Sequence, residues 1–165
     1  MAKIYRDGDV DVGVLQGRRI GVIGYGNQGR AQALNLRDSG FTPMVGNRED
    51  PYRDQAIADG FAVQAIERVA ETADVLLILV PDEMQTQVYE EQIKPHLRAG
   101  DVLCFASGYN VYYKAIVPPA GVGAIMVAPR MIGRAVRNLY QEKLGFPCLV
   151  AAENDAEGRF MKISL

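Results

Sequence analysis

Three glycines stand between an apolar run and a helix-like segment near the beginning of this chain. Gly24, Gly26 and Gly29 fit the pattern G-x-G-x-x-G, with a strand-like run at residues 18–23 before them and a helical pattern at residues 27–38 after them. In that context the first glycine permits a tight turn, the second lets a pyrophosphate approach the backbone, and the third allows close packing of helix on strand. The helix N-terminus adds free N–H groups and a positive dipole end. The pattern therefore predicts a dinucleotide-binding turn.

The same alternation of strand and helix continues along the chain. Strands are expected at residues 18–23, 42–45, 61–63, 75–80, 101–106, 124–128 and 147–152, and helices at residues 27–38, 51–59, 66–72, 83–92 and 133–142. Alternation with short connections predicts an α/β fold, a doubly wound, mostly parallel Rossmann-type sheet with helices on both faces. Ligands of such sheets bind outside the carboxyl ends of the strands, so the residues that follow strands are the candidates for a site.

Composition excludes several classes of protein. The chain has 165 residues with 18 basic and 20 acidic side chains, a balance that argues against a nucleic-acid binder. Its longest apolar stretch, residues 75–80, is too short to cross a membrane, and no secretory signal is expected. Cys104 and Cys148 both lie in apolar runs, which predicts reduced core residues of a cytoplasmic protein. A single histidine excludes mechanisms that need two.

The loop after the second expected strand carries charges of both signs. Arg48 and Arg53 suit the 2′-phosphate of NADP, because guanidinium groups match phosphate geometry. Glu49, Asp50 or Asp54 instead suits the free ribose hydroxyl of NAD and would repel the phosphate. The residues leave both cofactors open.

Polar residues also follow the later strands. The stretch from Asp82 to Gln85 follows the fourth expected strand, and Ser107 and Asn110 follow the fifth, where the nicotinamide half of a cofactor should lie. Asp82 is equally well interpreted as the N-cap of the next helix. Arg130 and Gly133 follow the sixth strand near the same rim.

The last residues predict the start of another helix. Residues 154–157 combine a capping side chain with acidic residues, and apolar residues follow up to Leu165 without a C-cap. We therefore expect residues 1–152 to form the dinucleotide-binding domain and residues 153–165 to lead into a C-terminal helical domain absent from this chain. The alternative is a short terminal helix that packs on the sheet.

Several motifs occur together in an order that resembles one family. They are Ile23-Gly24-Tyr25-Gly26-Asn27-Gln28-Gly29, residues 33–40 (ALNLRDSG), Val80-Pro81-Asp82-Glu83, Val127-Ala128-Pro129-Arg130, Gln16-Gly17 and residues 145–149 (GFPCL). With them the chain resembles, over nearly its whole length, the N-terminal domain of ketol-acid reductoisomerases (acetohydroxyacid isomeroreductases). That resemblance implies an NADPH- or NADH- and magnesium-dependent oxidoreductase of branched-chain amino-acid biosynthesis. Its small-molecule substrates would be 2-hydroxy-2-alkyl-3-oxo acids (2-acetolactate or 2-aceto-2-hydroxybutyrate), converted to 2,3-dihydroxy acids by an alkyl shift and then hydride transfer.

The resemblance also implies roles for individual residues. It assigns Tyr25, Gly26, Asn27 and Gln28 to the pyrophosphate end of the cofactor, beside Gly24 and Gly29 of the glycine pattern. It further assigns Arg48 to the adenosine ribose or its phosphate, Asp82, Glu83, Met84 and Gln85 to the middle of the cofactor, and Gly133 to the nicotinamide side.

Two departures from the family bear on catalysis. Ser107 stands where the family has an active-site histidine, and serine is not a proton carrier near neutral pH. The helical domain that carries the magnesium ligands is absent, so we expect no metal site in these residues. This chain alone should bind cofactor without turnover, and homo-oligomers are expected only with the missing domain.

Two other functions remain open at this point. One is a stand-alone NAD(P)-binding module without catalysis. The other is a fragment of a different Rossmann dehydrogenase, of the 3-hydroxyacid or imine reductase type.

Overall fold

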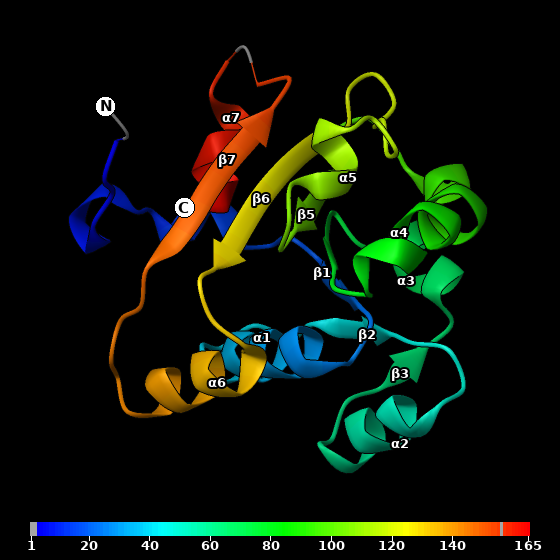
Figure 1. The fold of residues 1–165 in the computed structure, drawn as a ribbon, viewed down its shortest axis with the longest axis horizontal. Helices are drawn as coiled ribbons and strands as arrows, with labels where there is room; N and C mark the ends of the chain where they lie inside the picture. Colours follow the sequence, from blue (N-terminus) through cyan, green and yellow to red (C-terminus); the bar gives the residue numbers. More distant parts are fainter. Residues whose placement is uncertain (1–2, 156) are drawn as a thin grey trace.

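The computed structural model describes residues 3–155 and 157–165, and these form a seven-stranded sheet in the order β3-β2-β1-β4-β5-β6-β7 (Figure 1). The strands are β1 (Ile20–Ile23), β2 (Met44–Gly46), β3 (Val63–Gln64), β4 (Val75–Ile78), β5 (Val102–Phe105), β6 (Gly123–Pro129) and β7 (Cys148–Glu153). β1 to β6 pair in parallel, and β7 pairs antiparallel with β6. The predicted doubly wound, mostly parallel sheet is confirmed. The strand order reverses between β1 and β4, the position where such sheets bind ligands.

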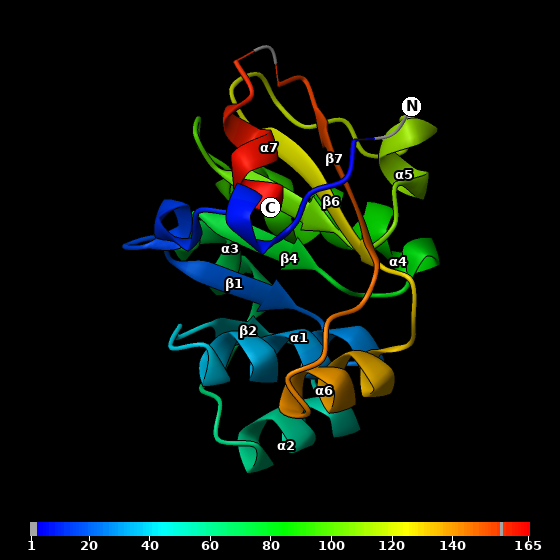
Figure 2. The ribbon, with the colours of Figure 1, turned by 90° about the vertical axis from the view of Figure 1, so that its left-hand side faces the viewer.

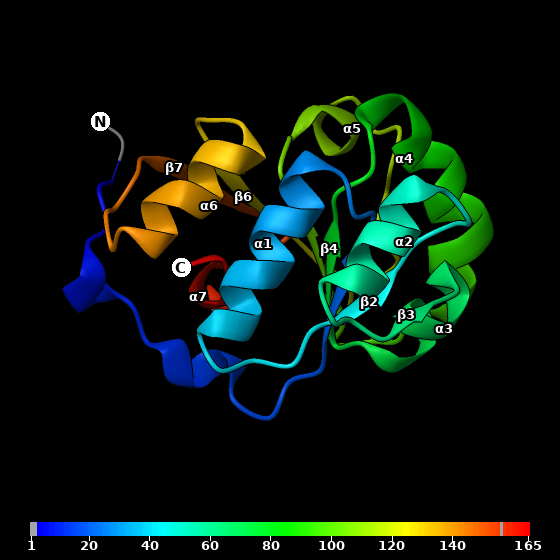
Figure 3. The same cartoon turned by 90° about the horizontal axis from the view of Figure 1, so that it is seen from below.

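Helices cover both faces of this sheet. They are α1 (Asn27–Asp38), α2 (Pro51–Ala58), α3 (Ile66–Thr72), α4 (Asp82–Val88), α5 (Tyr109–Tyr112), α6 (Gly133–Gln141) and α7 (Arg159–Ser164), with short 3-10 turns at Asp7–Asp9, Val12–Leu15 and Lys94–His96 and a π-helical turn at Tyr89–Ile93. Figure 3 shows α6, α1 and α2 side by side in front of the sheet. In Figure 2, α7 lies beside β6 and β7. None of the helices in the described ranges is long and apolar enough to span a membrane.

Apolar side chains on alternate strand positions form the core. Ile23, Leu76 and Phe105 face α3 and the π-helical turn, where Val69 and Tyr89 cover them. On the other face, a second cluster joins Val22 and Val45 to Leu34 of α1 and to Tyr25 and Phe61. Burying one such side chain contributes about 1.5–3 kcal/mol to stability, so the two clusters anchor β1 and β2 from both sides.

The predicted boundaries are confirmed for α1 and α3 and shift elsewhere. β1 begins at Ile20 because Arg19 leaves the strand pattern and pairs with Asp74, Nη2 to Oδ1 at 2.6 Å. The helix expected at residues 83–92 is two segments, α4 and the π-helical turn Tyr89–Ile93. Pro95 follows that turn, and proline lacks the N–H that a continuing helix would need.

The prediction that both cysteines are core residues is right for one of them. Cys104 on β5 is buried, and burial raises the pKa of its thiol to about 12. Cys148 is exposed, so its assignment to the core was wrong. Its strand β7 lies at the edge of the sheet and is mostly exposed, which an apolar run alone does not reveal. Both thiols are free.

The terminal helix starts later than predicted. α7 begins at Arg159, not at residue 154, and Gly158 precedes it with φ +66°. Part of the expected helix start, Ala156, lies outside the described residues. The Asp155 carboxylate still caps the first turn, since it accepts the N–H of Phe160 at 3.0 Å and of Met161 at 2.7 Å. The division at residue 152 stays a prediction.

Candidate functional site

A cavity of about 640 Å³ lies at the carboxyl ends of β1, β2 and β4. The turn after β1, the loop after β2 and the loop after β4 line it, and Ala106 after β5 completes the wall. This is the reversal point of the strand order, where ligands bind in doubly wound sheets. Most of the predicted cofactor residues line this cavity, whereas Gly29, Glu83, Ser107 and Gly133 do not.

The three glycines differ in what requires them. A Cβ on Gly24, whose φ is +89°, would lie 2.7 Å from Val80 Cγ1, and a Cβ on Gly29 would lie 1.9 Å from the Gly24 carbonyl oxygen. A Cβ on Gly26 would meet nothing within 4 Å. Packing therefore requires Gly24 and Gly29, whereas Gly26 leaves open space at the cavity wall. That space fits the close approach of a pyrophosphate to the backbone.

The first turn of α1 faces this cavity with its amide groups. Gly26 is the N-cap residue, so no side chain caps the helix. The initial N–H groups of a helix have no partner within it. Asn27 and Gln28 line the cavity, so their amide groups and the helix dipole suit an anionic group.

Tyr25 lines the cavity, although the residue is almost fully buried. Its side chain is 1% exposed and packs edge-on against Phe61, with ring centroids 5.6 Å apart. Its hydroxyl donates to Asp59 Oδ2 at 3.0 Å, and burial together with this hydrogen bond raises the pKa of the phenol. Its N–H donates to Asn47 Oδ1 at 3.0 Å. The tyrosine ring therefore anchors the turn and has no direct access to a ligand.

The loop after β2 places an arginine and an aspartate at the cavity. Arg48 is largely exposed, and its Nε lies 3.0 Å from Asp50 Oδ2. Asp50 caps α2 by accepting the N–H groups of Tyr52 and Arg53. Burial alone would raise the pKa of Asp50, but hydrogen bonds led by that from Arg48 hold it below its ordinary value. The arginine predicted to meet the ribose thus shares the site with an ionised carboxylate.

The loop after β4 corrects one prediction. Asp82 is the first residue of α4 and Pro81 is the N-cap, so the interpretation of Asp82 as the N-cap was wrong. Proline already supplies the extended conformation required before the helix, with φ −53° and ψ 142°. Asp82, Met84 and Gln85 line the cavity, and Glu83 does not.

The Gln85 side chain is buried, and both its nitrogen and its oxygen form hydrogen bonds with the protein. Its Nε2 donates to Val80 O at 3.1 Å and Asp82 Oδ1 at 3.0 Å, and its Oε1 accepts from Asn110 Nδ2 at 3.0 Å. Asn110 also donates to Asp82 O at 2.9 Å. This amide pair therefore joins the loop after β4 to the loop that carries Ser107.

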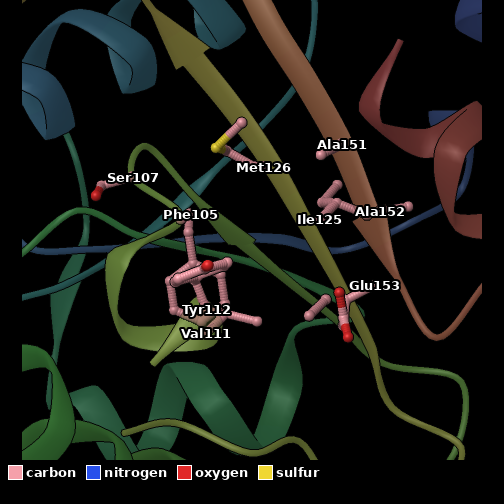
Figure 4. Close-up of a pocket in the computed structure, with 11 residues that line it drawn as sticks. Phe105, Ser107, Val111, Tyr112, Ile125, Met126, Ala151, Ala152 and Glu153 are labelled. Atoms are coloured by element: carbon pink, nitrogen blue, oxygen red, sulfur yellow. The ribbon is translucent and has the colours of Figure 1, made fainter. Parts of the chain in front are cut away.

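Ser107 lines a second, smaller cavity of about 220 Å³, which Figure 4 shows between β5, β6, β7 and α5. Phe105, Tyr112 and Glu153 share this cavity. The Ser107 Oγ accepts the Tyr109 N–H at 3.3 Å. Its neighbour Ala106 lines the main cavity, so Ser107 lies just beyond the main site's wall.

Gly133 is fixed by helix packing. A Cβ there would lie 1.8 Å from the Asn27 carbonyl oxygen, so the start of α6 abuts the start of α1. Gln28 Nε2 supports the same contact by donating to Met131 O at 2.9 Å. Gly133 lines a neighbouring groove of about 820 Å³ between α1, α2 and α6, which also reaches Gly26 and Asn27. Its assignment to the nicotinamide side stays a prediction.

Sequence reasoning assigned no role to Asn47 and Asp59, and it placed Asn110 near the nicotinamide half of a cofactor without its bonds to Asp82 and Gln85. Asn47 follows an apolar strand, a position that could have drawn attention to it. The partners of Asn47 and Asn110 lie 22 to 28 residues away, however, so no local pattern indicates those bonds.

No metal centre is assembled in the described part of the chain. Within residues 3–155 and 157–165, no group of three or more histidine, cysteine, aspartate or glutamate side chains is placed to hold an ion.

Comparisons with known proteins agree on one family. The family model described as "Acetohydroxy acid isomeroreductase, NADPH-binding domain" matches residues 14–165. A protein of Pyrobaculum arsenaticum named ketol-acid reductoisomerase (NADP(+)) is 49% identical over 100% of this chain and 51% of its own length. One of Methanococcus maripaludis with the same name is 48% identical over 93% of this chain and 47% of its own length. The chain thus spans about half the length of these curated relatives.

Solved structures give the same result. An NADH-preferring ketol-acid reductoisomerase from an uncultured archean superposes with a TM-score of 0.96 at 44% identity, over 99% of this chain and 51% of that one. A 3-hydroxyisobutyrate dehydrogenase of Mycobacterium tuberculosis has a TM-score of 0.67 at 15% identity, over 89% of this chain and 51% of its own. The second likeness shows the fold alone.

Proposed function

This chain belongs to the acetohydroxy acid isomeroreductase, or ketol-acid reductoisomerase, family, and we propose that it binds NADPH or NADH in the cavity at the carboxyl ends of β1, β2 and β4. The observation that carries the proposal is Gly26, whose missing side chain leaves open space beside the uncapped start of α1. The chain's own packing does not require a glycine there, whereas a pyrophosphate close to the backbone does. The residues present therefore fit the cofactor.

Each part of the cavity then has a task. The backbone of Gly26, Asn27 and Gln28 holds the pyrophosphate, with Gly24 and Gly29 shaping the turn. Arg48 binds the adenosine ribose or its phosphate. Asp82 and Met84 face the middle of the cofactor, while Gln85 acts by holding its loop. Glu83 and Gly133 lie outside this cavity, so any contact from them comes from its rim.

Both cofactor forms are included for a physical reason. Arg48 provides a cation for the 2′-phosphate of NADPH. Asp50, 3.0 Å from the same guanidinium, provides an acceptor for the free hydroxyl of NADH and opposes the phosphate. Relatives of both kinds occur, since the Pyrobaculum relative is named for NADP(+) and the archean structure is described as NADH-preferring.

We extend the proposal to a protein of the length of the curated relatives, of which this chain spans about half. There the nicotinamide, when bound, would supply the hydride needed to convert 2-acetolactate or 2-aceto-2-hydroxybutyrate to a 2,3-dihydroxy acid for branched-chain amino-acid biosynthesis. Ser107 would offer a hydroxyl that donates and accepts hydrogen bonds near the nicotinamide end. The described residues do not fit a magnesium site, so no metal-dependent step is assigned to this chain.

The remaining expectations follow the same division. Residues 1–152 form the cofactor domain and residues 153–165 lead onward, with magnesium ligands and self-association belonging to the further domain. The working protein is a cytoplasmic enzyme. A stand-alone module or another Rossmann dehydrogenase is not favoured, because relatives near 48% identity carry the reductoisomerase name over the whole chain.

The test is a titration of this chain with NADPH and NADH, followed by the fluorescence of the reduced nicotinamide. We expect saturable binding, weakened about tenfold in Gly26→Ala, which corresponds to about 1.4 kcal/mol. The melting temperature should not fall, because the added methyl group meets no neighbour. An unchanged affinity in Gly26→Ala, or no binding by the unmodified chain, would contradict the proposal. Turnover of 2-acetolactate with magnesium by the whole protein tests its second part.

A further inference from the structure

Asn47 is the first residue after β2, and its side chain is buried at 6% exposure. Its Oδ1 accepts the Tyr25 N–H at 3.0 Å. Its Nδ2 donates to Arg48 O at 2.9 Å and to Asp50 Oδ1 at 2.8 Å. The side-chain oxygen of Asn47 therefore binds one loop of the candidate site, and its side-chain nitrogen binds another.

The first of these loops is the glycine turn. Gly24 N–H donates to Gly46 O at 2.9 Å, and Tyr25 N–H donates to the Asn47 side chain. Two successive amide groups of the turn are thus tied to the end of β2. The next residue, Gly26, is the one that opens onto the cavity. The position of the pyrophosphate-binding backbone is therefore set by Asn47 as well as by β1.

The second loop carries the groups for the adenosine ribose. Asp50 receives Asn47 Nδ2 and holds the Arg48 guanidinium. The Asn47 main chain is itself bound on both sides, since its N–H donates to Gln64 O at 3.3 Å and its carbonyl accepts from Arg53 Nη1, also at 3.3 Å. One buried amide thereby connects the turn, the ribose loop and β3.

We propose that Asn47 is a positioning residue for dinucleotide binding, which holds the glycine turn and the Arg48–Asp50 loop at the separation that one dinucleotide spans. The inference rests on the proposed function and goes beyond it, because Asn47 acts through Tyr25 and Asp50 and does not need to touch the ligand. A ligand that contacts both loops gains from their fixed spacing, since it does not have to order them on binding. A ligand that contacts only one loop gains much less.

The experiment compares a spanning ligand with a fragment. NADH reaches the ribose loop and the glycine turn, whereas AMP reaches the ribose loop and has no pyrophosphate. Affinity for NADH is measured by nicotinamide fluorescence, and affinity for AMP by competition against it. We expect Asn47→Ala to weaken NADH binding about tenfold or more and AMP binding no more than threefold.

Two further variants control for stability. Asn47→Leu fills a similar volume without hydrogen bonds, so it should show the same split between NADH and AMP even if Asn47→Ala folds poorly. Asp74→Ala removes hydrogen bonds to Arg19 at the opposite end of β4 from the cavity. It should lower the melting temperature while leaving both affinities within about twofold, because neither Asp74 nor Arg19 lines the cavity.

The outcomes separate this inference from the function it rests on. If the unmodified chain binds neither NADH nor NADPH, the proposed function fails and this inference with it. If the unmodified chain binds but both Asn47 variants bind NADH normally, or lose NADH and AMP by the same factor, only the positioning role is overturned.

Discussion

The central strand β1 and the edge strand β7 are both rich in apolar residues but lie in opposite environments. Every residue of β1 is buried, because strands flank it and helices cover both of its faces. β7 has one neighbouring strand, runs against it, and is mostly exposed along its six residues. Leu149 on β7 is 52% exposed, whereas Val22 on β1 is 0% exposed.

This difference divides the molecule into two regions. The half around β1 is braced by backbone contacts at Gly24 and Gly29 and by the amide of Asn47. In the half around β7, the contacts are between side chains, and several large apolar side chains are exposed to solvent, including those of Tyr109, Tyr112 and Tyr113. Substitutions should therefore cost most where backbone meets backbone, and least at the exposed edge. Four variants test that ordering.

Gly29→Ala should have the largest effect. The new Cβ would lie 1.9 Å from the Gly24 carbonyl oxygen, and no side-chain rotation relieves a clash of a Cβ with a main-chain oxygen. We expect a loss of about 3 kcal/mol or more in the free energy of unfolding, at or above the usual cost of overpacking. Urea denaturation followed by circular dichroism measures it. In an ordinary helix, Gly→Ala stabilises by about 1 kcal/mol, so a gain would refute the close contact of α1 with the turn.

Gly123→Ala on β6 should cost less, about 1–2 kcal/mol. Here the Cβ would lie 2.5 Å from Cδ1 of Phe160, a side chain on α7 that can move. The same denaturation experiment in a Phe160→Leu background provides the control. In that background the loss of stability caused by Gly123→Ala should be smaller, because the clash with the Phe160 ring is gone. An equal loss in both backgrounds would show that the Phe160 side chain is not what the new methyl group meets.

Asp59→Asn should cost about 1 kcal/mol at pH 7, since Arg30, its partner, is half exposed. The hydrogen bond from Arg30, opposed by burial and aided by Tyr25, lowers the pKa of Asp59. A lowered pKa stabilises the fold above the ordinary carboxyl value, near pH 4. This contribution is lost as the pH falls below that value and through the lowered pKa. The melting temperature should therefore fall less steeply between pH 7 and pH 2.5 in Asp59→Asn than in the unmodified chain. If the two curves of melting temperature against pH ran parallel, Asp59 would not be a source of the pH dependence.

Leu149→Ser should have the smallest effect, within about 0.5 kcal/mol, because the side chain is exposed at the sheet edge. Leu103→Ser on β5 is the matched comparison, with the same chemical change at a fully buried site. It should cost several-fold more. If the two variants lost similar stability, the contrast between edge and centre would be wrong.

Sequence patterns predicted the parts of this fold that depend on neighbouring residues. α1 begins and ends as expected because glycines mark both of its ends, and the apolar runs located every strand within a few residues. The exposure of Cys148 was missed, since an apolar run does not say whether it lies at the centre or the edge of a sheet. The alternative interpretation of Asp82 as an N-cap was wrong because Pro81 takes that position.

The candidate site was predicted in outline for the same reason. Glycine spacing located the turn, and strand ends located the loops. What the patterns could not supply were side-chain contacts between distant segments, such as Asn110 with Gln85 and Asn47 with Tyr25. Those bonds exist only once the sheet brings the loops together, so they carry no periodic signal.

The fit of Gly133 against Asn27 has a consequence for the order in which the protein is made. The start of α1 is supported by a segment more than a hundred residues later, through Gly133 and through the bond from Gln28 to Met131. During synthesis, the turn and its helix leave the ribosome long before that support exists. Contacts of such long sequence separation form slowly. A nascent chain therefore carries all three glycines of its turn well before it can hold the turn in its final place.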